Sequence, residues 1–519
     1  MNSKSYTSLL GVAALAAAFT ANASASFFTP GDILVSSSTY SGDASLITNG
    51  VSILPNGSNA VANGSYFQVF NNEVPDANFG VTTPAAISEL TPAGSIVQTL
   101  NVPTNVLVTS FSSKSELGLN LSQDGKSVSF MGYNSDTNQF DISNTATPDF
   151  AIASNGTALP TYRVIGQLNS DGSWTNSAGN TRTLVDSYSG NNGRAAILTT
   201  NGYYTVGNAN YVPVGSQPKS INTGVQYVST ANIGNNNTST ISNNSISLGN
   251  FNITQYGYAA DKSQKDNNFR GVTVFNNTLY VTKGSGGNGI DTVYQVGAAG
   301  TLPTASNNIT ILPGFDTNLA TGNLLHHPFG LYFANASTLY VADEGSGAFA
   351  DFTNGLGYNA YAGLEKWSLN GGTWQMDYIL TNGLNIGQNY TVSGTNNGVA
   401  GSYTTATDGL RQLAGQTNAD GTVTLYTVSS TANNWTNGST INSKDAGADP
   451  NKLFGITDVL SDTNASQVTG ESFTNIESAA YGQVLRGVSF APVPEPSTWA
   501  LLGLGTVAAL FAVRRKQNS

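Results

Sequence analysis

Residues 270–275 read RGVTVF and begin a series of four short apolar runs that are separated by turn residues. The runs that follow are TLYVT at 278–282, TVYQV at 292–296 and ITIL at 309–312. They are rich in β-branched and aromatic side chains and are bounded by Gly, Asn or Pro, which is typical of β-strands. Four strands within about 45 residues match the size of one propeller blade, so this stretch predicts a small antiparallel sheet.

The next stretch repeats the same order of strands. Residues 328–333 read PFGLYF, 338–343 read TLYVAD, 363–369 read GLEKWSL and 374–380 read WQMDYIL. Helical periodicity is nearly absent between the two ends of the chain. We therefore expect an all-β protein built from repeated four-stranded units.

Weaker copies of this unit fill the rest of the chain. Their tight turns are marked by Asp124-Gly125, Asn201-Gly202 and Asp420-Gly421, which favour hairpins. The pattern predicts a six-bladed β-propeller, with opening strands near residues 486, 117, 195, 270, 329 and 409.

Two insertions leave alternatives open. Strands hidden at 40–80 or 208–245 would make the propeller seven-bladed, and an unclosed β-sandwich or a β-solenoid is a further alternative. The polar, Asn- and Gly-rich stretches at 232–245 and 382–406 are expected to be long surface loops.

The first and last strands of the repeat region look like one blade divided between the two ends of the chain. Residues 485–490 (LRGVSF) copy the opening strand at 270–275. Residues 32–36, 86–90 and 96–100 supply a second, third and fourth strand without a first. We expect the N- and C-terminal strands to pair, because this closure removes an open sheet edge that would invite aggregation.

Two phrases in the second unit resemble the blades of NHL-type propellers. They are Pro-x-Gly-Leu at 328–331 and Leu-Tyr-Val-Ala-Asp at 339–343. The resemblance is confined to this unit. It supports the architecture, but a shared fold implies no activity.

The composition is that of an exported β-protein. Charged residues make up 9% of the 519 residues, against about 25% in an average soluble protein, and Gly, Ser, Thr and Asn take their place. The lack of cysteine excludes disulfides, thiolate metal sites and cysteine nucleophiles. Stability must therefore come from a large apolar core, which a chain of this length can bury.

The N-terminus has the features of a secretory signal peptide that forms a short helix. Lys4 gives a positive start, residues 9–19 are apolar, and Ala23-Ser24-Ala25 is a cleavage site. We divide the chain into a signal peptide at 1–25, a β-propeller domain at 26–492 and a tail at 493–519.

The tail combines a short motif, an apolar run and a basic end. These are Val493-Pro494-Glu495-Pro496, residues 499–513 and Arg514-Arg515-Lys516. The apolar run is predicted to form a hydrophobic helix, although it is shorter than the roughly 17–25 residues of a full membrane span. The basic end should stay on the cytoplasmic side.

The tail resembles the PEP-CTERM sorting tail of Gram-negative bacteria. This resemblance implies that an exosortase recognises the tail and removes it near Pro-Glu-Pro. The protein would be exported through the inner membrane and would contact it only transiently through the C-terminal helix. After tail processing it would end at the cell surface or in the extracellular matrix. A plain C-terminal anchor is the alternative.

Loss of both ends changes the net charge of the chain. It would remove Lys4, Arg514, Arg515 and Lys516 from 19 basic residues, and Glu495 from 30 acidic residues. The remaining net charge of about −14 should repel nucleic acid and anionic lipid. No nucleic-acid partner is expected.

A candidate metal site lies around the only two histidines, His326 and His327, which precede a predicted opening strand. Asp343 and Glu344 follow the next strand of the same blade, and the four residues could hold a divalent cation such as calcium. Adjacent side chains of a strand point to opposite sides, so one histidine at most should face the channel. The alternative is a hydrogen-bonded loop pair. No catalytic residue can be assigned, because no nucleophile elbow, phosphate-binding loop or dinucleotide fingerprint occurs in a usable context. The glycine-rich run at 284–289 lies between two predicted strands with no helix after it, and is expected to be a turn.

Trp435 is the candidate ligand-binding aromatic residue. It lies in a polar run at 432–437, and its ring could stack on a sugar. Trp367 and Trp374, by contrast, are expected to pack between blades.

The leading hypothesis is an exported, exosortase-processed propeller that binds exopolysaccharide or protein partners without catalysis. The link to exopolysaccharide comes from the association of the sorting-tail family with exopolysaccharide production. A calcium-dependent lactonase or hydrolase with ligands in the channel is the alternative, and a purely structural surface protein is the second alternative.

Overall fold

The computed structural model describes most of the chain between its two ends. The described residues are 26–40, 51, 81–111, 113–139, 142–147, 161–175, 183–184, 187–209, 223–230, 245–249, 251, 253–258, 266–284, 288–320, 326–347, 360–396, 398–432, 435–437, 440–442 and 447–494. The predicted signal helix and the predicted C-terminal helix lie outside these residues. Within this part of the chain, no helix has the length and apolar character needed to cross a membrane.

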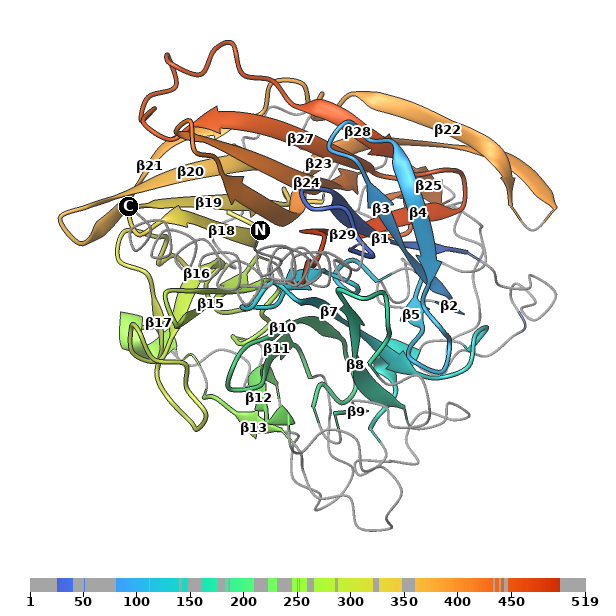
Figure 1. Ribbon diagram of the computed structural model, residues 1–519, viewed down its shortest axis with the longest axis horizontal. Helices are drawn as coiled ribbons and strands as arrows, with labels where there is room; N and C mark the ends of the chain where they lie inside the picture. The colour runs from blue at the N-terminus through green and yellow to red at the C-terminus, as the bar shows by residue number, and fades with distance from the viewer. Residues whose placement is uncertain are drawn as a thin grey trace, which may run out of the picture.

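Six antiparallel sheets follow one another along the chain and are arranged around a common centre (Figure 1). The predicted six-bladed β-propeller is therefore confirmed, and the seven-bladed alternative is wrong.

The first three blades have four strands each. The first contains β29 (Gln483–Phe490), β1 (Ile33–Thr39), β3 (Ala85–Leu90) and β4 (Ile96–Asn101). The second contains β6 (Asn120–Leu121), β7 (Ser127–Asn134), β8 (Tyr162–Asn169) and β9 (Thr183–Leu184). The third contains β10 (Gly193–Leu198), β11 (Tyr203–Gly207), β12 (Gly224–Val228) and β13 (Ile246–Ser247).

The remaining blades follow the same order from opening strand to outer strand. The fourth contains β14 (Val272–Phe275), β15 (Thr278–Lys283), β16 (Thr292–Val296) and β17 (Ile309–Ile311). The fifth contains β18 (Pro328–Asn335), β19 (Thr338–Asp343), β20 (Gly363–Asn370) and β21 (Thr373–Leu380). The sixth has five strands, because β22 (Asn389–Asn396) precedes the opening strand β23 (Val399–Thr417). The strands that follow are β24 (Thr422–Ala432), β27 (Lys452–Val459) and β28 (Thr474–Ser478).

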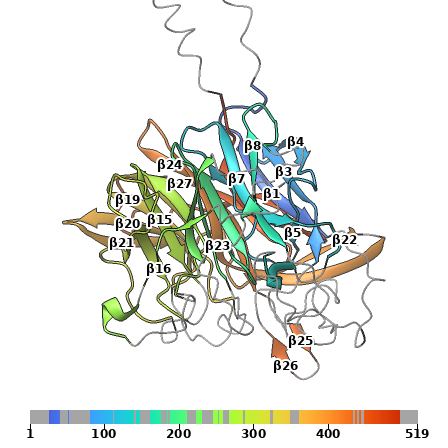
Figure 2. The same ribbon diagram turned by 90° about the horizontal axis from the view of Figure 1, so that it is seen from below.

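Short elements lie between the blades. β2 (Thr82–Thr83) pairs with β5 (Thr109–Ser110), and β25 (Trp435–Asn437) pairs with β26 (Thr440–Asn442). Two 3-10 turns lie at Ile142–Asn144 and Ile253–Tyr256. In Figure 2 the β25–β26 hairpin projects from the body of the propeller.

The first blade is closed by strands from both ends of the repeat region, as the sequence predicts. β1 pairs antiparallel with β29, so that Ile33 lies opposite Phe490 and Val35 opposite Val488. The other edge of β1 pairs antiparallel with β3. This closure leaves β1 with a hydrogen-bonded partner on each side, which protects it from pairing with another chain.

The prediction of a surface loop at 382–406 is wrong. Most of this stretch forms β22 and the first part of β23, which pair from Asn389↔Ala406 to Asn396↔Val399. The ribbon extends away from the blade and is visible beside β22 in Figure 2. The second predicted loop, at 232–245, lies almost entirely outside the described residues.

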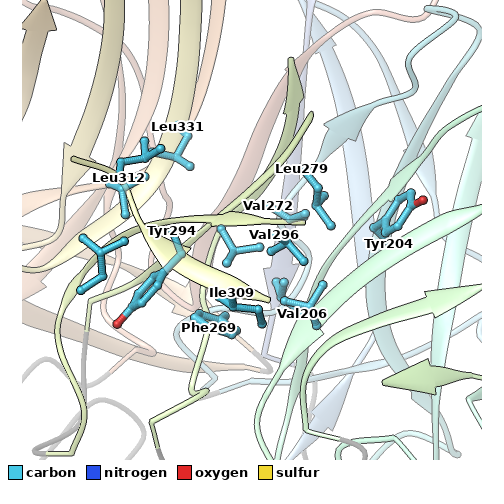
Figure 3. Close-up of a cluster of buried hydrophobic side chains, with 14 of the residues drawn as sticks. Tyr204, Val206, Phe269, Val272, Leu279, Tyr294, Val296, Ile309, Leu312 and Leu331 are labelled. Carbon is cyan, nitrogen blue, oxygen red and sulfur yellow. The ribbon is translucent and has the colours of Figure 1, made fainter. Parts of the chain in front are cut away.

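The core lies between the faces of neighbouring blades. Figure 3 shows the largest cluster, in which Tyr204 and Val206 of the third blade meet Leu279 and Val296 of the fourth. Fully burying a side chain of this size contributes about 1.5–3 kcal/mol. Trp367 and Trp374 belong to the same cluster, and Trp367 stacks on Phe315 with ring centroids 4.0 Å apart.

The opening strands approach one another closely at the centre. A side chain at Gly271 would collide with the carbonyl of Phe329, and one at Gly487 would collide with the backbone of Leu117. Gly118 and Ala195 form a parallel bridge between the second and third blades. Glycine is therefore needed where these strands meet, because no side chain would fit.

Candidate functional site at the propeller axis

Several opening strands carry a β-bulge at an equivalent position, and the bulged residue is an arginine. Arg194 lies between the pairs Gly193↔Gly207 and Ala195↔Val206. Arg486 lies between Leu485↔Ser37 and Gly487↔Ser36. Bulges turn a side chain out of the regular alternation of a strand, so these bulges aim arginine side chains at the axis.

Two more arginines occupy similar irregularities. Arg411 follows Leu410, where the register of β23 against β24 shifts. Arg270 and Gly271 both hydrogen-bond to Thr282, through its carbonyl oxygen at 2.7 Å and its Oγ1 at 2.9 Å. We call Arg194, Arg270, Arg411 and Arg486 the axial arginine cluster.

The axial arginine cluster is buried, with 5–8% of each residue exposed. Arg270 Nη1 donates to Ser115 Oγ at 2.8 Å, and thus links the fourth blade to the segment that leads into the second. Arg486 Nε donates to Ser38 Oγ at 3.1 Å, and its Nη2 donates to the carbonyl of Phe111. The charge of Arg270 acts on Arg194, and the charge of Arg411 acts on Arg270 and Arg486, so the four side chains lie close together although they come from separate blades.

The pKa shifts of the arginines show that their charges act on one another. Burial lowers the pKa of Arg194 well below its ordinary value, and the charge of Arg270 lowers it further. Burial also lowers the pKa of Arg486 to about 10, and the charge of Arg411 adds to that effect. The cluster is therefore a concentrated, poorly hydrated positive charge.

Two carboxylates lie beside the cluster. Glu344 Oε2 accepts from Arg411 Nε at 2.9 Å. Burial alone would raise the pKa of Glu344, but the charges of Arg411 and Arg270 outweigh it and hold the pKa below its ordinary value.

Glu116 is surrounded by hydrogen-bond donors. It accepts from Thr109 Oγ1 at 2.8 Å, from the Ser110 amide at 3.0 Å and from Asn192 Nδ2 at 2.9 Å, and the Tyr133 hydroxyl also donates to it. Burial nevertheless raises its pKa above the ordinary value.

The two histidines of the predicted metal site face different surroundings. His327 Nδ1 lies 2.9 Å from the carbonyl oxygen of Gly284, and its backbone amide donates to Asp343 Oδ2 at 2.6 Å. His326 Nε2 lies 3.7 Å from Glu365 Oε1, and its Nδ1 lies 3.8 Å from Asp316 Oδ2.

The structure thus brings Asp343 to His327 but directs the Glu344 carboxylate to Arg411. Among the residues that the structure describes, no group of three or more His, Asp and Glu side chains is arranged to hold a metal ion. Burial, together with the charge of Asp343, raises the pKa of Glu365 well above its ordinary value.

Trp435 lies at the start of β25, opposite Asn442 of β26. This hairpin is separate from the six blades, and the predicted aromatic residue is therefore not part of the axial site.

The axial arginine cluster was not predicted from the sequence. A sequence pattern that marks the cluster is nevertheless present, because Arg precedes Gly in the opening strands at 270–271 and 486–487. That repeat predicts equivalent strands, but period-2 alternation alone does not reveal a bulge, and so it could not place the arginines on the axis.

Comparison with known proteins identifies the tail. The PEP-CTERM protein-sorting motif matches residues 492–516. The chain carries a PEP-CTERM sorting motif. The motif indicates an exported protein that an exosortase processes and that is sorted to the surface or the extracellular space. Its first residues follow the closing strand β29, and the Val493 amide donates to the carbonyl of Gly125 at 3.0 Å. Residues from Glu495 onward lie outside the described part of the chain.

Similarity to other proteins is weak. None of the curated proteins matches this chain. An acylaminoacyl peptidase in complex with Z-Gly-Gly-Phe-chloromethyl ketone is 7% identical over 78% of this chain and 44% of its own, with a TM-score of 0.30. A structure of S. cerevisiae dbp5 bound to nup159, gle1, IP6 and ADP is 8% identical over 88% of this chain and 95% of the other, with a TM-score of 0.25.

At these TM-scores neither structure bears on the function of the chain, which spans less than half the length of the peptidase chain. The resemblance to NHL-type blades is not confirmed and stays a prediction.

Proposed function

We propose that the processed protein is a non-catalytic binding propeller of the cell surface or extracellular matrix, with exopolysaccharide or a surface protein as its partner. The observation that supports a binding role is the state of the two axial carboxylates. Glu344 is paired with Arg411, and Glu116 accepts hydrogen bonds from four protein groups. Carboxylates held in this way stabilise the fold and are poorly placed to ligate a metal or to transfer a proton.

Two features support a polysaccharide partner. The sorting motif is that of a protein sorted to the surface or the extracellular space, where a matrix polysaccharide would be within reach. The exposed polar side chains of the extended β22–β23 ribbon, such as Thr391, Ser393 and Thr395 of β22, could hydrogen-bond to sugar hydroxyls. A protein partner would use the same ribbon through its backbone edge.

The alternative is a calcium-dependent hydrolase that acts through His326, His327, Asp343 and Glu344. Its site would need these side chains to converge, whereas Glu344 is drawn to Arg411 and His326 lies against Glu365. The purely structural role remains the second alternative, and it predicts no ligand.

The experiment that separates these functions uses the protein and the matrix polysaccharide of the bacterium that produces it. Binding is measured by co-sedimentation, and cleavage by the release of reducing ends in the presence of calcium. The proposal predicts co-sedimentation without new reducing ends. Calcium-dependent cleavage that is lost in H327A would favour the hydrolase, and no binding to polysaccharide or to surface proteins would favour the structural role.

We also propose that the mature chain runs from about Ser26 to about Pro494, and that its contact with the membrane through the C-terminal helix is transient. Intact-mass measurement of the secreted protein checks both ends, because exosortase processing should remove the mass of the tail from about Pro494 onward. A secreted protein that keeps the mass of residues 497–519 would overturn this proposal.

A further inference from the structure

We infer that the axial arginine cluster binds an oxyanion, meaning a carboxylate, sulfate or phosphate group. The inference begins with the balance of charge at the axis. Arg194 hydrogen-bonds to the Asn268 side chain and the Phe269 carbonyl, and Arg486 to Ser38 and the Phe111 carbonyl, so among the described residues these two buried guanidinium groups hydrogen-bond only to neutral groups. A buried charge without a partner is costly, and a bound anion would remove that cost.

The second step concerns hydrogen-bond donors that the protein leaves unused. Arg194 Nε, Arg486 Nη1 and Gln412 Nε2 are buried and have no acceptor in the structure. Each of the three residues is 5% exposed, so bulk water is a poor substitute. Buried donors are almost always satisfied in native proteins, which indicates that an acceptor belongs here.

The third step concerns where these donors lie. Arg194 and Arg486 come from bulges on the opening strands of the third and first blades. Gln412, on the opening strand of the sixth blade, reaches so far inward that its amide would collide with a side chain at Gly118 of the second blade. Donors from three blades therefore point to the same axis.

The chemistry of the donors selects the ligand. A guanidinium group presents its N–H donors in a planar fork that matches the paired oxygen atoms of carboxylate, sulfate and phosphate. A cation would be repelled by the excess of positive charge, and a neutral sugar would leave that charge unbalanced. An oxyanion satisfies both the charge and the donors.

Two sources could supply this group: a free inorganic ion, or an acidic sugar residue of the matrix polysaccharide. The second source rests on the proposed function, whereas the first is independent of it. The two are separated by using sodium sulfate and sodium glucuronate as probes.

The test measures the melting temperature of the full chain, purified in a non-ionic detergent and dialysed against a Tris chloride buffer without oxyanions. Sulfate is titrated against sodium chloride at equal ionic strength. We expect a saturable rise that reaches about 2–3 °C at 100 times the dissociation constant, because a ligand that binds the folded state stabilises it. The general effect of sulfate on proteins does not saturate, so it can be subtracted.

Variants assign the effect to the axis. R486Q should weaken sulfate binding about tenfold or more, since a charge-assisted hydrogen bond is lost. K126Q removes one positive charge from the exposed turn before β7, outside the cluster, and should keep the wild-type response. If R486Q does not fold, calorimetric titration of the wild-type protein with sulfate still decides between binding and no binding.

The absence of saturable sulfate binding to the wild-type protein would overturn the inference, as would unchanged binding in R486Q. Glucuronate binding in addition to sulfate binding would support the site and the polysaccharide as its source. Sulfate binding without glucuronate binding would support the site and a free ion as its source, whatever the outcome of the co-sedimentation experiment.

Discussion

Glu344 and Arg411 join two neighbouring blades through a single buried ion pair. Glu344 follows β19 of the fifth blade, Arg411 lies on β23 of the sixth, and both side chains are buried. Removing one member of such a pair leaves the other charge without a partner, which costs about 3–5 kcal/mol. We expect E344Q to lower the free energy of unfolding by about 3 kcal/mol in urea denaturation.

The double variant E344Q/R411Q provides the control for this prediction. It removes both charges, so it should lose less stability than the two single variants added together. Strict additivity, or a loss in E344Q as small as that of an exposed D420N variant, would show that the pair is not coupled.

Glu471 makes stability depend on pH in the neutral range. Burial, and then the neighbouring Asp458, raise the pKa of Glu471 to about 8 in the folded protein, from an ordinary value of 4.5. Between these values the folded state holds a proton that the unfolded state has lost, so stability falls as pH rises from about 4.5 to about 8. We expect E471Q to flatten this decline and to be more stable than the wild type at pH 9.

Urea denaturation at a series of pH values measures this effect. D420N is the matched control, because hydrogen bonds from Thr422 lower the pKa of Asp420 and its titration lies below this range. A wild-type protein whose stability rises between pH 5 and 8, with E471Q following the same curve, would contradict the assignment.

Single residues at the axis were the hardest part to predict from the sequence. Asp343 accepts a hydrogen bond from the His327 amide, but the side-chain partners of the two histidines lie on segments distant in the chain, such as Gly284 and Glu365. The arginines depend on bulges, which are set by the register between strands and leave no periodic trace in the sequence.

At the scale of elements, the closure of the first blade carries the greatest consequence. β29 supplies the opening strand for β1, with seven residues of β1 in register. Truncation after Gly482 removes this strand and exposes the edge of β1, so we expect loss of cooperative unfolding and aggregation in size-exclusion chromatography.

Truncation after Pro494 is the matched control for this prediction. It removes the tail but keeps β29 and the hydrogen bond from the Val493 amide to Gly125, so it should remain monodisperse and unfold cooperatively. A soluble, cooperatively folded 1–482 chain would contradict the role of the closing strand. Exosortase processing near Pro494 is compatible with the fold for the same reason.

The strands themselves were well predicted, because each has one apolar face and tight turns at its ends. The order of the first blade could be predicted because the missing strand at one end matches the surplus strand at the other. The β22–β23 ribbon was not predicted, since most residues of β22 are polar or glycine and the two strands pair across a turn at Gly398. A mostly polar antiparallel ribbon resembles a loop in composition.

At the scale of the whole molecule, three features agree. The chain carries an export and sorting motif, it folds as a six-bladed propeller, and its axis concentrates positive charge within a protein that is acidic overall. The acidic surface would repel anions at a distance, so the axial cluster would capture an oxyanion through desolvated hydrogen bonds rather than by long-range attraction. We propose that this arrangement serves binding, whereas the hydrolase alternative requires a cation at the axial face.

Thermal unfolding of the full chain in the presence of calcium and in the presence of a chelator tests this central claim most directly. A calcium ion bound at 100 times its dissociation constant would raise the melting temperature of a chain of this length by about 2–3 °C. The account predicts equal melting temperatures in calcium and in chelator. A fall of a few degrees on chelation, absent in H327A, would place a cation at the axial face and contradict the account.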